Sequence, residues 1–500
     1  MIELSEETSD IFCQGLPSKP LSGIGRILVS GASGYIGGRL VPELLYRGYK
    51  VRALVRGDPL TYKNIWPDAE IVKSDILNKE DIRSALYGID TAYYLIHSLH
   101  LGLKEFEKAD IKAACNFRDA AWEQGVKRII YLGGLGDVRS ELSSHLRSRS
   151  EVAKELKKGK VPVTVLRAAV IIGSGSASYE IIQHLAVKLP IVPIPYWAKN
   201  KCQPIGVRDV IKYLVGALET PETQGRSFDI GGKDVLTYEE MLKTFTRLLM
   251  KKTIFIDFPF IPLKVYAYFA SLLTPVPHAI TNCLMEGLKN EVICYDNSIK
   301  DYLPFEPLSY QEQIVRALSR EEQDRVSTRW SDAYHPYYDL ALKLYEVKQP
   351  VTYSVRYSIL TEKEADKLFR SLCRIGGRRG WFYYNWLWRL RGAIDRIFLG
   401  VGTIRGRKSY THLKVNDVVD FFRVEDIKEN ENLLLRAEMK IPGRAWLEFN
   451  IKEETGKRRL SVIAYYNTQS LSGKIYWYSC LPLHHFLFRK LLIGIEDKAK

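Results

Sequence analysis

Apolar segments of strand length alternate with amphipathic segments along the first 230 residues. The apolar runs lie at 26–30, 50–55, 69–73, 91–96, 128–132 and 163–172. Segments with helical periodicity separate most of them, at 38–46, 104–123 and 151–157 among others. Strands that alternate with helices form parallel sheets, so the pattern predicts an α/β fold with a doubly wound Rossmann-type sheet.

The pattern changes after residue 350. A strand at 352–360 and a helix at 362–374 precede a basic aromatic segment, several strands of alternating polarity and a long helix from about Leu483. Alternating polarity is typical of antiparallel sheets that pack one face on a core. The C-terminal part is therefore predicted to be an α+β domain.

These patterns divide the chain into four parts. We expect a flexible N-terminal tail over 1–25, a Rossmann domain over 26–318, a charged connector over 319–350 and the α+β domain over 351–497. A substrate-side lobe should begin near residue 173 of the Rossmann domain. Its proline-broken aromatic run could form an apolar lid or close a contact between domains. A length of 500 residues agrees with two domains, because one core stops growing at roughly 250 to 300 residues.

Charge and cysteine content narrow the class of protein. The net charge of +15 suits an anionic partner such as a phosphorylated cofactor, a membrane surface or a nucleic acid, and does not choose among them. The seven cysteines include no C-x-x-C pair, which argues against a disulfide framework and a zinc site. We therefore expect a soluble cytoplasmic protein without a metal centre.

Two segments come nearest to a membrane span. The run 258–277 is broken by four prolines, and the run 475–495 carries His484, His485 and two basic residues. A transmembrane helix needs about 20 apolar residues, so neither is expected to span. Both are interpreted as core-facing or interdomain helices, and peripheral contact with the inner membrane face is left open.

A glycine triplet follows the first strand, in the sequence Gly31-Ala32-Ser33-Gly34-Tyr35-Ile36-Gly37. Gly31 permits a sharp turn, Gly34 lets the backbone approach a pyrophosphate, and Gly37 allows a helix to pack closely on the strand. The start of that helix presents N–H groups to an anion. Because the triplet joins the first strand to the first helix, it predicts a dinucleotide site that includes Ser33, Tyr35 and Ile36.

The residue after the second strand bears on the choice of dinucleotide. Arg56 lies where a site that prefers NAD usually has a carboxylate. Its guanidinium can bind a 2′-phosphate, with Arg52 or Arg39 assisting, so NADP(H) is favoured over NAD(H). The nearby Asp58 keeps NAD(H) open. Residues that follow the third and fourth strands are expected to border the adenine or the nicotinamide: Asp75, Ile76 and His97.

Several motifs in this half resemble a known family. The stretch 27–136 looks like an atypical short-chain dehydrogenase of the NmrA-like kind, related to the NADPH-carrying accessory subunit of respiratory complex I. The resemblance continues in four later motifs: HLRSR at 145–149, GSGSA at 173–177, QPIGVRDV at 203–210 and FDIGG at 228–232. The whole chain is similar to bacterial proteins that join such a domain to one of unknown function. This resemblance implies cofactor binding more directly than it implies a reaction.

The sequence departs from active short-chain dehydrogenases at the catalytic positions. Those enzymes use Tyr-x-x-x-Lys, in which the tyrosine passes a proton to a carbonyl oxygen. Here the corresponding residues are His145 and Arg149, and glycines replace the serine or threonine after the fifth strand. In one interpretation, His145 is the general acid near neutral pH and Arg149 holds the ribose and orients a hydrophobic carbonyl or quinone-like substrate. In the other, the protein is a catalytically silent NADPH-binding accessory or sensor.

The C-terminal motifs resemble the helix-grip fold of START and Bet v 1-like proteins. The motifs are RGR at 405–407, VVDFFRV at 418–424, LLLRAEM at 433–439 and PGRAWLEF at 442–449. The resemblance implies a curved sheet around the last helix with a cavity for an apolar ligand. Trp446, Phe449 and Tyr465 could fill that cavity.

A basic aromatic segment in the same domain suggests further partners. Residues 376–414 hold nine basic residues and one acidic residue, Asp395, interleaved with aromatic residues. Such a segment could be a solvated or interdomain surface, or could bind an anionic lipid face. No nucleic-acid-binding module is present, so nucleic acid is not an expected partner. The expected partners are a dinucleotide, a hydrophobic small molecule or lipid, and a membrane or membrane complex.

Overall fold

The structure is a computed structural model with two compact units. It describes residues 11–57, 59–97, 106–136, 143–322, 328–332, 344, 351–403, 405, 407, 412–454 and 456–500. The first unit comprises Met1–Tyr268 with Ala279–Pro336, and the second comprises Phe269–His278 with Tyr337–Lys500.

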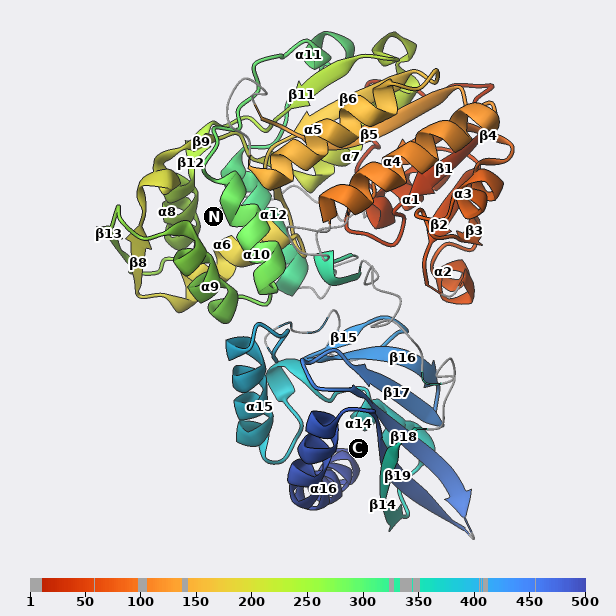
Figure 1. Ribbon diagram of the computed structural model, residues 1–500, viewed down its shortest axis with the longest axis vertical. Helices are drawn as coiled ribbons and strands as arrows, with labels where there is room; N and C mark the ends of the chain where they lie inside the picture. The colour runs from red at the N-terminus through yellow and green to blue at the C-terminus, as the bar shows by residue number, and fades with distance from the viewer. Residues whose placement is uncertain are drawn as a thin grey trace. The chain divides into compact units, whose positions relative to one another are not determined.

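The first unit is built on a seven-stranded parallel sheet with the order β11-β6-β5-β4-β1-β2-β3 (Figure 1). Its strands are β1 (Arg26–Ser30), β2 (Val51–Val55), β3 (Glu70–Lys73), β4 (Ile89–Tyr94), β5 (Arg128–Gly134), β6 (Val163–Ala168) and β11 (Ser227–Ile230). The predicted doubly wound Rossmann-type fold is confirmed. The sequence pattern predicted six of these strands, and the short β11 adds a seventh at the edge beside β6.

Helices cover both faces of this sheet. They are α1 (Gly37–Tyr46), α2 (Pro59–Ile65), α3 (Lys79–Leu86), α4 (Phe106–Glu123), α5 (Ser144–Lys157) and α7 (Val207–Glu219). Alternate residues of β1 point to opposite faces, so Ile27 and Val29 pack in the core with α1 and α7, whereas Leu28 packs in the core with α3, α4 and α5. Figure 1 shows α4 and α5 lying across one face.

A lobe follows β6 at the carboxyl end of the sheet. Its helices are α6 (Ala177–Lys188), α8 (Tyr238–Leu248), α10 (His278–Gly287), α11 (Ile299–Tyr302) and α12 (Tyr310–Glu322). Helix α9 (Leu263–Leu273) begins in this lobe, and its residues from Phe269 onward belong to the second unit. Short strands pair within it: β7 (Ile171–Ile172) with β10 (Ile205–Gly206), β9 (Lys201–Cys202) with β12 (Leu236–Thr237), and β8 (Ile191–Ile194) with β13 (Ile254–Asp257).

Two expected boundaries differ in the structure. Residues 11–25 were expected in a flexible tail, but Phe12, Cys13 and Leu16 are buried in the core beside α1. The carboxylate of Glu43 accepts the Phe12 and Cys13 N–H groups, which fixes this segment. At the other end, α12 continues past residue 318, and Trp330 donates its backbone N–H to the Gly175 carbonyl at 2.8 Å. Residues 1–10 and most of the expected connector lie outside the described residues.

The second unit is built on a six-stranded antiparallel sheet with the order β14-β19-β18-β17-β16-β15. Its strands are β14 (Tyr353–Thr361), β15 (Val418–Val419), β16 (Phe422–Lys428), β17 (Asn432–Ala437), β18 (Arg444–Glu454) and β19 (Lys457–Asn467). Its helices are α14 (Ala365–Leu372), α15 (Asn385–Ile397) and α16 (Leu471–Asp497). The predicted α+β architecture is confirmed, and the more specific likeness to the helix-grip fold stays a prediction.

The last helix is longer than expected. It begins at Leu471, not near Leu483, because Ser470 caps its first turn by accepting the Gly473 N–H and the helix continues through Pro482. Leu491 and Leu492 of α16 pack into one core with Phe449 and Val462 of the sheet. Trp446 is also buried, and its indole N–H donates to Glu425 at 2.9 Å.

Candidate functional site

The glycine loop has the geometry of a phosphate-binding turn. Gly31 adopts φ +71°, and a Cβ there would lie 2.8 Å from the Leu95 carbonyl oxygen. A Cβ on Gly37 would overlap the backbone of Gly31 and Ala32. A Cβ on Gly34 would meet only the Gly31 carbonyl oxygen, at 3.2 Å. The fold therefore requires the first and third glycines, whereas Gly34 leaves open space where a pyrophosphate would approach.

The start of α1 fits an anion. Its N-cap is Ile36, and no side chain caps the helix there. The first N–H groups of a helix have no acceptor within the helix, so this end of α1 can donate to a phosphate. Ser33, Tyr35 and Ile36 are all half-buried beside the turn. The residues present thus fit the diphosphate of a dinucleotide.

Of the residues expected around the adenosine half of the dinucleotide, two lie at an edge of the sheet and one is buried in the core. Arg56 follows β2, is partly exposed, and has its Nη2 3.9 Å from Asp75 Oδ1, so both border one edge of the sheet. Ile76 is buried in the core below them. Asp58 lies outside the described residues.

The two assisting arginines are engaged elsewhere, which corrects that expectation. Arg52 is buried and donates to the Ala85 and Tyr87 carbonyls at 2.6 and 2.8 Å. Arg39 is buried, lies over the Tyr35 ring at 4.2 Å, and donates to the Ser174 carbonyl at 3.0 Å. Burial of both side chains leaves Arg56 as the partly exposed arginine among the three predicted.

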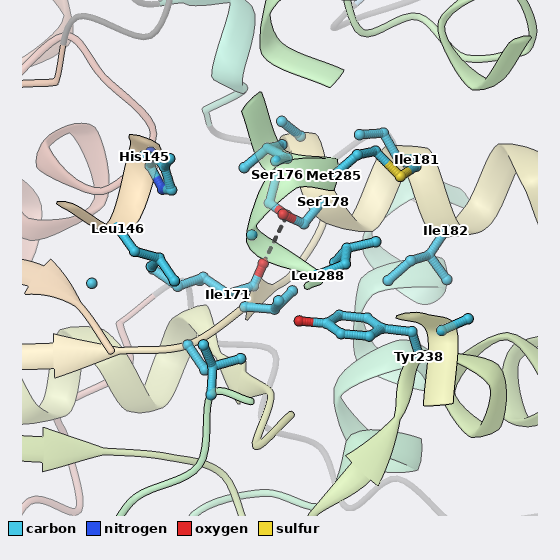
Figure 2. A pocket seen from close by; sticks show the side chains of 18 of the residues that line it. His145, Leu146, Ile171, Ser176, Ser178, Ile181, Ile182, Tyr238, Met285 and Leu288 are labelled. Carbon is cyan, nitrogen blue, oxygen red and sulfur yellow. Dashed lines mark hydrogen bonds between the residues drawn. The ribbon is translucent and has the colours of Figure 1, made fainter. Parts of the chain in front are cut away.

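A largely apolar cavity of about 350 Å³ opens at the carboxyl ends of β5 and β6. Ligands of doubly wound sheets bind at this end of the strands. Apolar residues from the β6–β7 segment, α6 and α10 line most of it, among them Ala168, Ile171, Ile181, Leu185, Met285 and Leu288. Polar lining comes from Tyr35, His97, His145, Ser176, Ser178 and Tyr238. Figure 2 shows His145 and Leu146 across the cavity from Ile182 and Tyr238.

The structure brings His145 and His97 together beside this cavity. Their ring centroids lie 5.0 Å apart, and His97 Nδ1 lies 3.3 Å from Oδ2 of the buried Asp110. Burial and the Arg149 charge lower the pKa of His97 to about 4. Burial, together with His97 and Arg149, lowers the pKa of His145 well below its usual value of 6.5. Both imidazoles are therefore neutral at pH 7.

Arg149 is buried close enough to both histidines to affect their pKa values, and it is not among the residues that line the cavity. Its Nη1 donates to the Ile96 carbonyl and to the Tyr131 hydroxyl, each at 3.4 Å, and its Nη2 lies 3.7 Å from Asp110 Oδ2. Burial disfavours the charged guanidinium, but Tyr131 and Asp110 offset this and raise the Arg149 pKa. The Arg149 guanidinium thus links Asp110, Tyr131 and the Ile96 carbonyl inside the protein.

Sequence reasoning missed two contributors to the site. Asp110 lies inside α4, where its spacing gives no signal that it meets His97 from the end of β4. Tyr238 comes from a helix far along the chain, and burial raises its pKa well above the usual value. Neither could be found without knowing how α4 and α8 pack.

Comparison with known proteins agrees with this fold. Residues 24–324 match the NmrA-like family. The chain belongs to the NmrA-like family. Its first unit therefore has the NAD(P)-binding Rossmann fold of atypical short-chain dehydrogenases. Residues 349–491 match a family described only as a protein of unknown function, DUF2867.

Curated relatives of this NmrA-like protein are distant. It is 25% identical to photosystem II assembly factor Ycf39 of Trieres chinensis, over 44% of this chain and 68% of that protein. It is 24% identical to the mitochondrial NADH dehydrogenase (ubiquinone) 1 alpha subcomplex subunit 9 of Arabidopsis thaliana, over 57% and 76%. It is 23% identical to ceramide reductase of Caulobacter vibrioides, over 47% and 74%.

Among solved structures, UDP-glucose 4-epimerase of Thermotoga maritima matches with a TM-score of 0.47 and 16% identity, over 60% of this chain and 99% of that one. No helix among the described residues combines the length and apolar character that crossing a membrane requires.

Proposed function

We propose that this protein binds NADP(H) and reduces a hydrophobic carbonyl or quinone-like compound held in the apolar cavity. The observation that carries the proposal is the position of the cavity, which reaches both Tyr35 of the glycine loop and His145. A ligand in it would lie beside the nicotinamide half of a dinucleotide whose diphosphate sits on Gly34. The name of the ceramide reductase relative supports an apolar substrate.

The residues of the chain would share the work of binding and orientation. The loop from Gly31 to Gly37 would hold the diphosphate, and Arg56 would hold the 2′-phosphate. The bound dinucleotide would supply the hydride, and the proton that the reduced oxygen takes up would come from solvent by way of the His145 N–H. The apolar walls around Ile181 and Leu288 would exclude water and orient the carbon that receives it.

His145 would act as a hydrogen-bond donor. Because its pKa is lowered well below 6.5, the imidazole is neutral at pH 7 and carries one proton on one ring nitrogen. A neutral imidazole can donate that N–H to a carbonyl oxygen, and it is a weaker acid than the imidazolium that the sequence suggested. His97, held by Asp110, would keep the His145 ring in place.

A second function is favoured by a different observation. Arg149 is bonded to groups inside the protein, so the position that is lysine in active relatives does not reach the cavity. A protein that holds NADPH and an apolar ligand without turnover would have this arrangement. The names of the complex I subunit and the photosystem II assembly factor support such an accessory role at a membrane complex.

A turnover assay separates the two functions. NADPH oxidation is measured with a panel of hydrophobic aldehydes, ketones and quinones. The reductase proposal predicts turnover with at least one compound, and His145→Ala should lower kcat/KM by roughly a hundredfold while the Kd for NADPH is kept. His485→Ala, at an exposed histidine of the second unit, is the matched control and should leave the rate unchanged. Tight NADPH binding without any turnover would contradict the reductase and support the accessory role.

A further inference from the structure

Helix α15 of the second unit presents apolar side chains to solvent. Trp386, Leu390 and Ile394 are spaced four residues apart, so they share one side of the helix. They are 62%, 49% and 42% exposed, respectively. Contiguous exposed apolar side chains on a protein surface usually mark an interaction site.

The opposite side of α15 holds the polar groups. Asp395 is buried and accepts the Gly402 N–H at 2.8 Å and the Lys440 N–H at 2.7 Å. Arg396 is buried and donates to the carbonyls of Ser271 and Thr274. Two charged residues of α15 thus face the protein beside the buried Trp388, whereas apolar residues of the same helix face water.

Helix α16 carries a similar exposed stripe. Ile475 and Tyr478 are each 60% exposed, and Phe486 is 65% exposed. The two helices are neighbours: the Tyr383 hydroxyl, just before α15, donates to Asp497 at 3.0 Å near the end of α16. Arg391 of α15 also interacts with Tyr476 near the start of α16. Figure 1 shows both helices in the second unit, where Trp388 of α15 and Leu491 of α16 pack into one core with the sheet.

The exposed charges on both helices are basic until the last turn of α16. Arg389 is exposed on α15, and Lys474, Arg489 and Lys490 are exposed on α16. The acidic Asp395 of α15 is buried and accepts a hydrogen bond from the Gly402 N–H, so it does not cancel these charges at the surface. Apolar and aromatic side chains flanked by cations match the interface of a bilayer that contains anionic lipids.

We propose that the α15–α16 face docks on an anionic lipid bilayer surface. The face consists of Trp386, Leu390 and Ile394 on α15 with Ile475, Tyr478 and Phe486 on α16. The apolar side chains enter the headgroup boundary, and Lys474 and Arg489 meet the anionic headgroups. Tryptophan and tyrosine favour this depth because their rings are apolar and carry a polar N–H or O–H. The helices lie along the surface, and the proposal does not depend on the reductase function.

Vesicle sedimentation of the full chain tests this proposal. Vesicles of phosphatidylcholine alone are compared with vesicles that also contain phosphatidylglycerol. We expect sedimentation with the anionic vesicles, weakened by salt because screening reduces attraction between charges. The triple variant Trp386→Gln, Leu390→Gln, Ile394→Gln should lower the partition coefficient by roughly tenfold or more. Lys474→Gln with Arg489→Gln should remove the preference for anionic vesicles.

The control removes exposed aromatics elsewhere. Tyr46 and Tyr87 are 58% and 73% exposed in the first unit, and Tyr46→Gln with Tyr87→Gln should leave sedimentation unchanged. The triple variant changes exposed side chains, so it should keep its folding and its NADPH affinity. The proposal would be overturned if the wild-type protein sedimented with neither kind of vesicle. It would also be overturned if the triple variant sedimented as the wild type does. A wild-type dimer that the triple variant converts to monomer, without vesicle binding, would assign the face to a second copy and would also overturn it.

Discussion

Arg56 is the residue on which the proposed preference for NADP(H) depends. It follows β2, is partly exposed, and lies near Asp75. Arg39 and Arg52 are close in sequence but buried, and their guanidiniums donate to backbone carbonyls. The sequence offered Arg52 and Arg39 as assistants to Arg56, because nothing in the sequence shows which side chain the fold turns inward.

The prediction at the residue scale compares the affinity for NADPH with the affinity for NADH. Arg56→Ala should weaken NADPH binding by roughly tenfold to a hundredfold, because a charge-assisted contact with the 2′-phosphate is lost. NADH affinity should change little. Titration calorimetry of both dinucleotides measures the two Kd values, and Arg83→Ala, at an arginine about half exposed on α3, is the control. An equal loss for both dinucleotides would contradict a role at the 2′-phosphate.

At the scale of elements, two glycines of the β1–α1 connection have different roles: Gly37 is needed for folding, and Gly34 is proposed to serve dinucleotide binding. Gly37 allows the first turn of α1 to pass close to Gly31, whereas Gly34 has open space on one side. The sequence pattern was enough to find this turn, because strand, glycine triplet and helix follow each other within a few residues. It could not find Asp110 of α4, whose role depends on packing between distant elements.

The element-scale prediction compares two alanine substitutions. Gly37→Ala should lower the free energy of unfolding by about 2 kcal/mol, because the new Cβ overlaps backbone atoms that cannot move aside easily. Gly34→Ala should cost less than about 1 kcal/mol but weaken dinucleotide binding by roughly tenfold. Urea unfolding and calorimetry measure the two effects. Unchanged NADPH affinity in Gly34→Ala would place the diphosphate elsewhere.

At the scale of the whole molecule, the alternation of apolar and amphipathic segments predicted the parallel sheet of the first unit and the antiparallel sheet of the second. The pattern failed for segments whose conformation depends on contacts with residues elsewhere in the fold. Phe12 looked like part of a loose tail because its partner Glu43 lies far along the chain. The start of α16 was predicted near Leu483, but the helix begins at Leu471 and includes Pro482.

Buried neutral histidines make the stability of the molecule depend on pH. Unfolded His97 takes up a proton below about pH 6.5, whereas the folded residue does so only near pH 4. The unfolded chain therefore binds more protons between these values, and the free energy of unfolding falls as pH drops through this window, by about 3 kcal/mol for His97 alone. His145 acts in the same direction.

Urea unfolding of the full chain between pH 7 and pH 4 measures this loss. His145→Gln should flatten the pH dependence, because one buried group that resists protonation is gone. His485→Gln, at an exposed position, should leave it unchanged. The same slope in His145→Gln as in wild type would show that this imidazole is not held neutral by burial.

The account rests on a dinucleotide bound by the glycine loop of the first unit. Titration calorimetry of the purified full chain with NADPH tests this most directly. We predict saturable binding at one site per chain, tighter for NADPH than for NADH. Absence of binding by both dinucleotides, with none released from the purified protein on denaturation, would contradict the account.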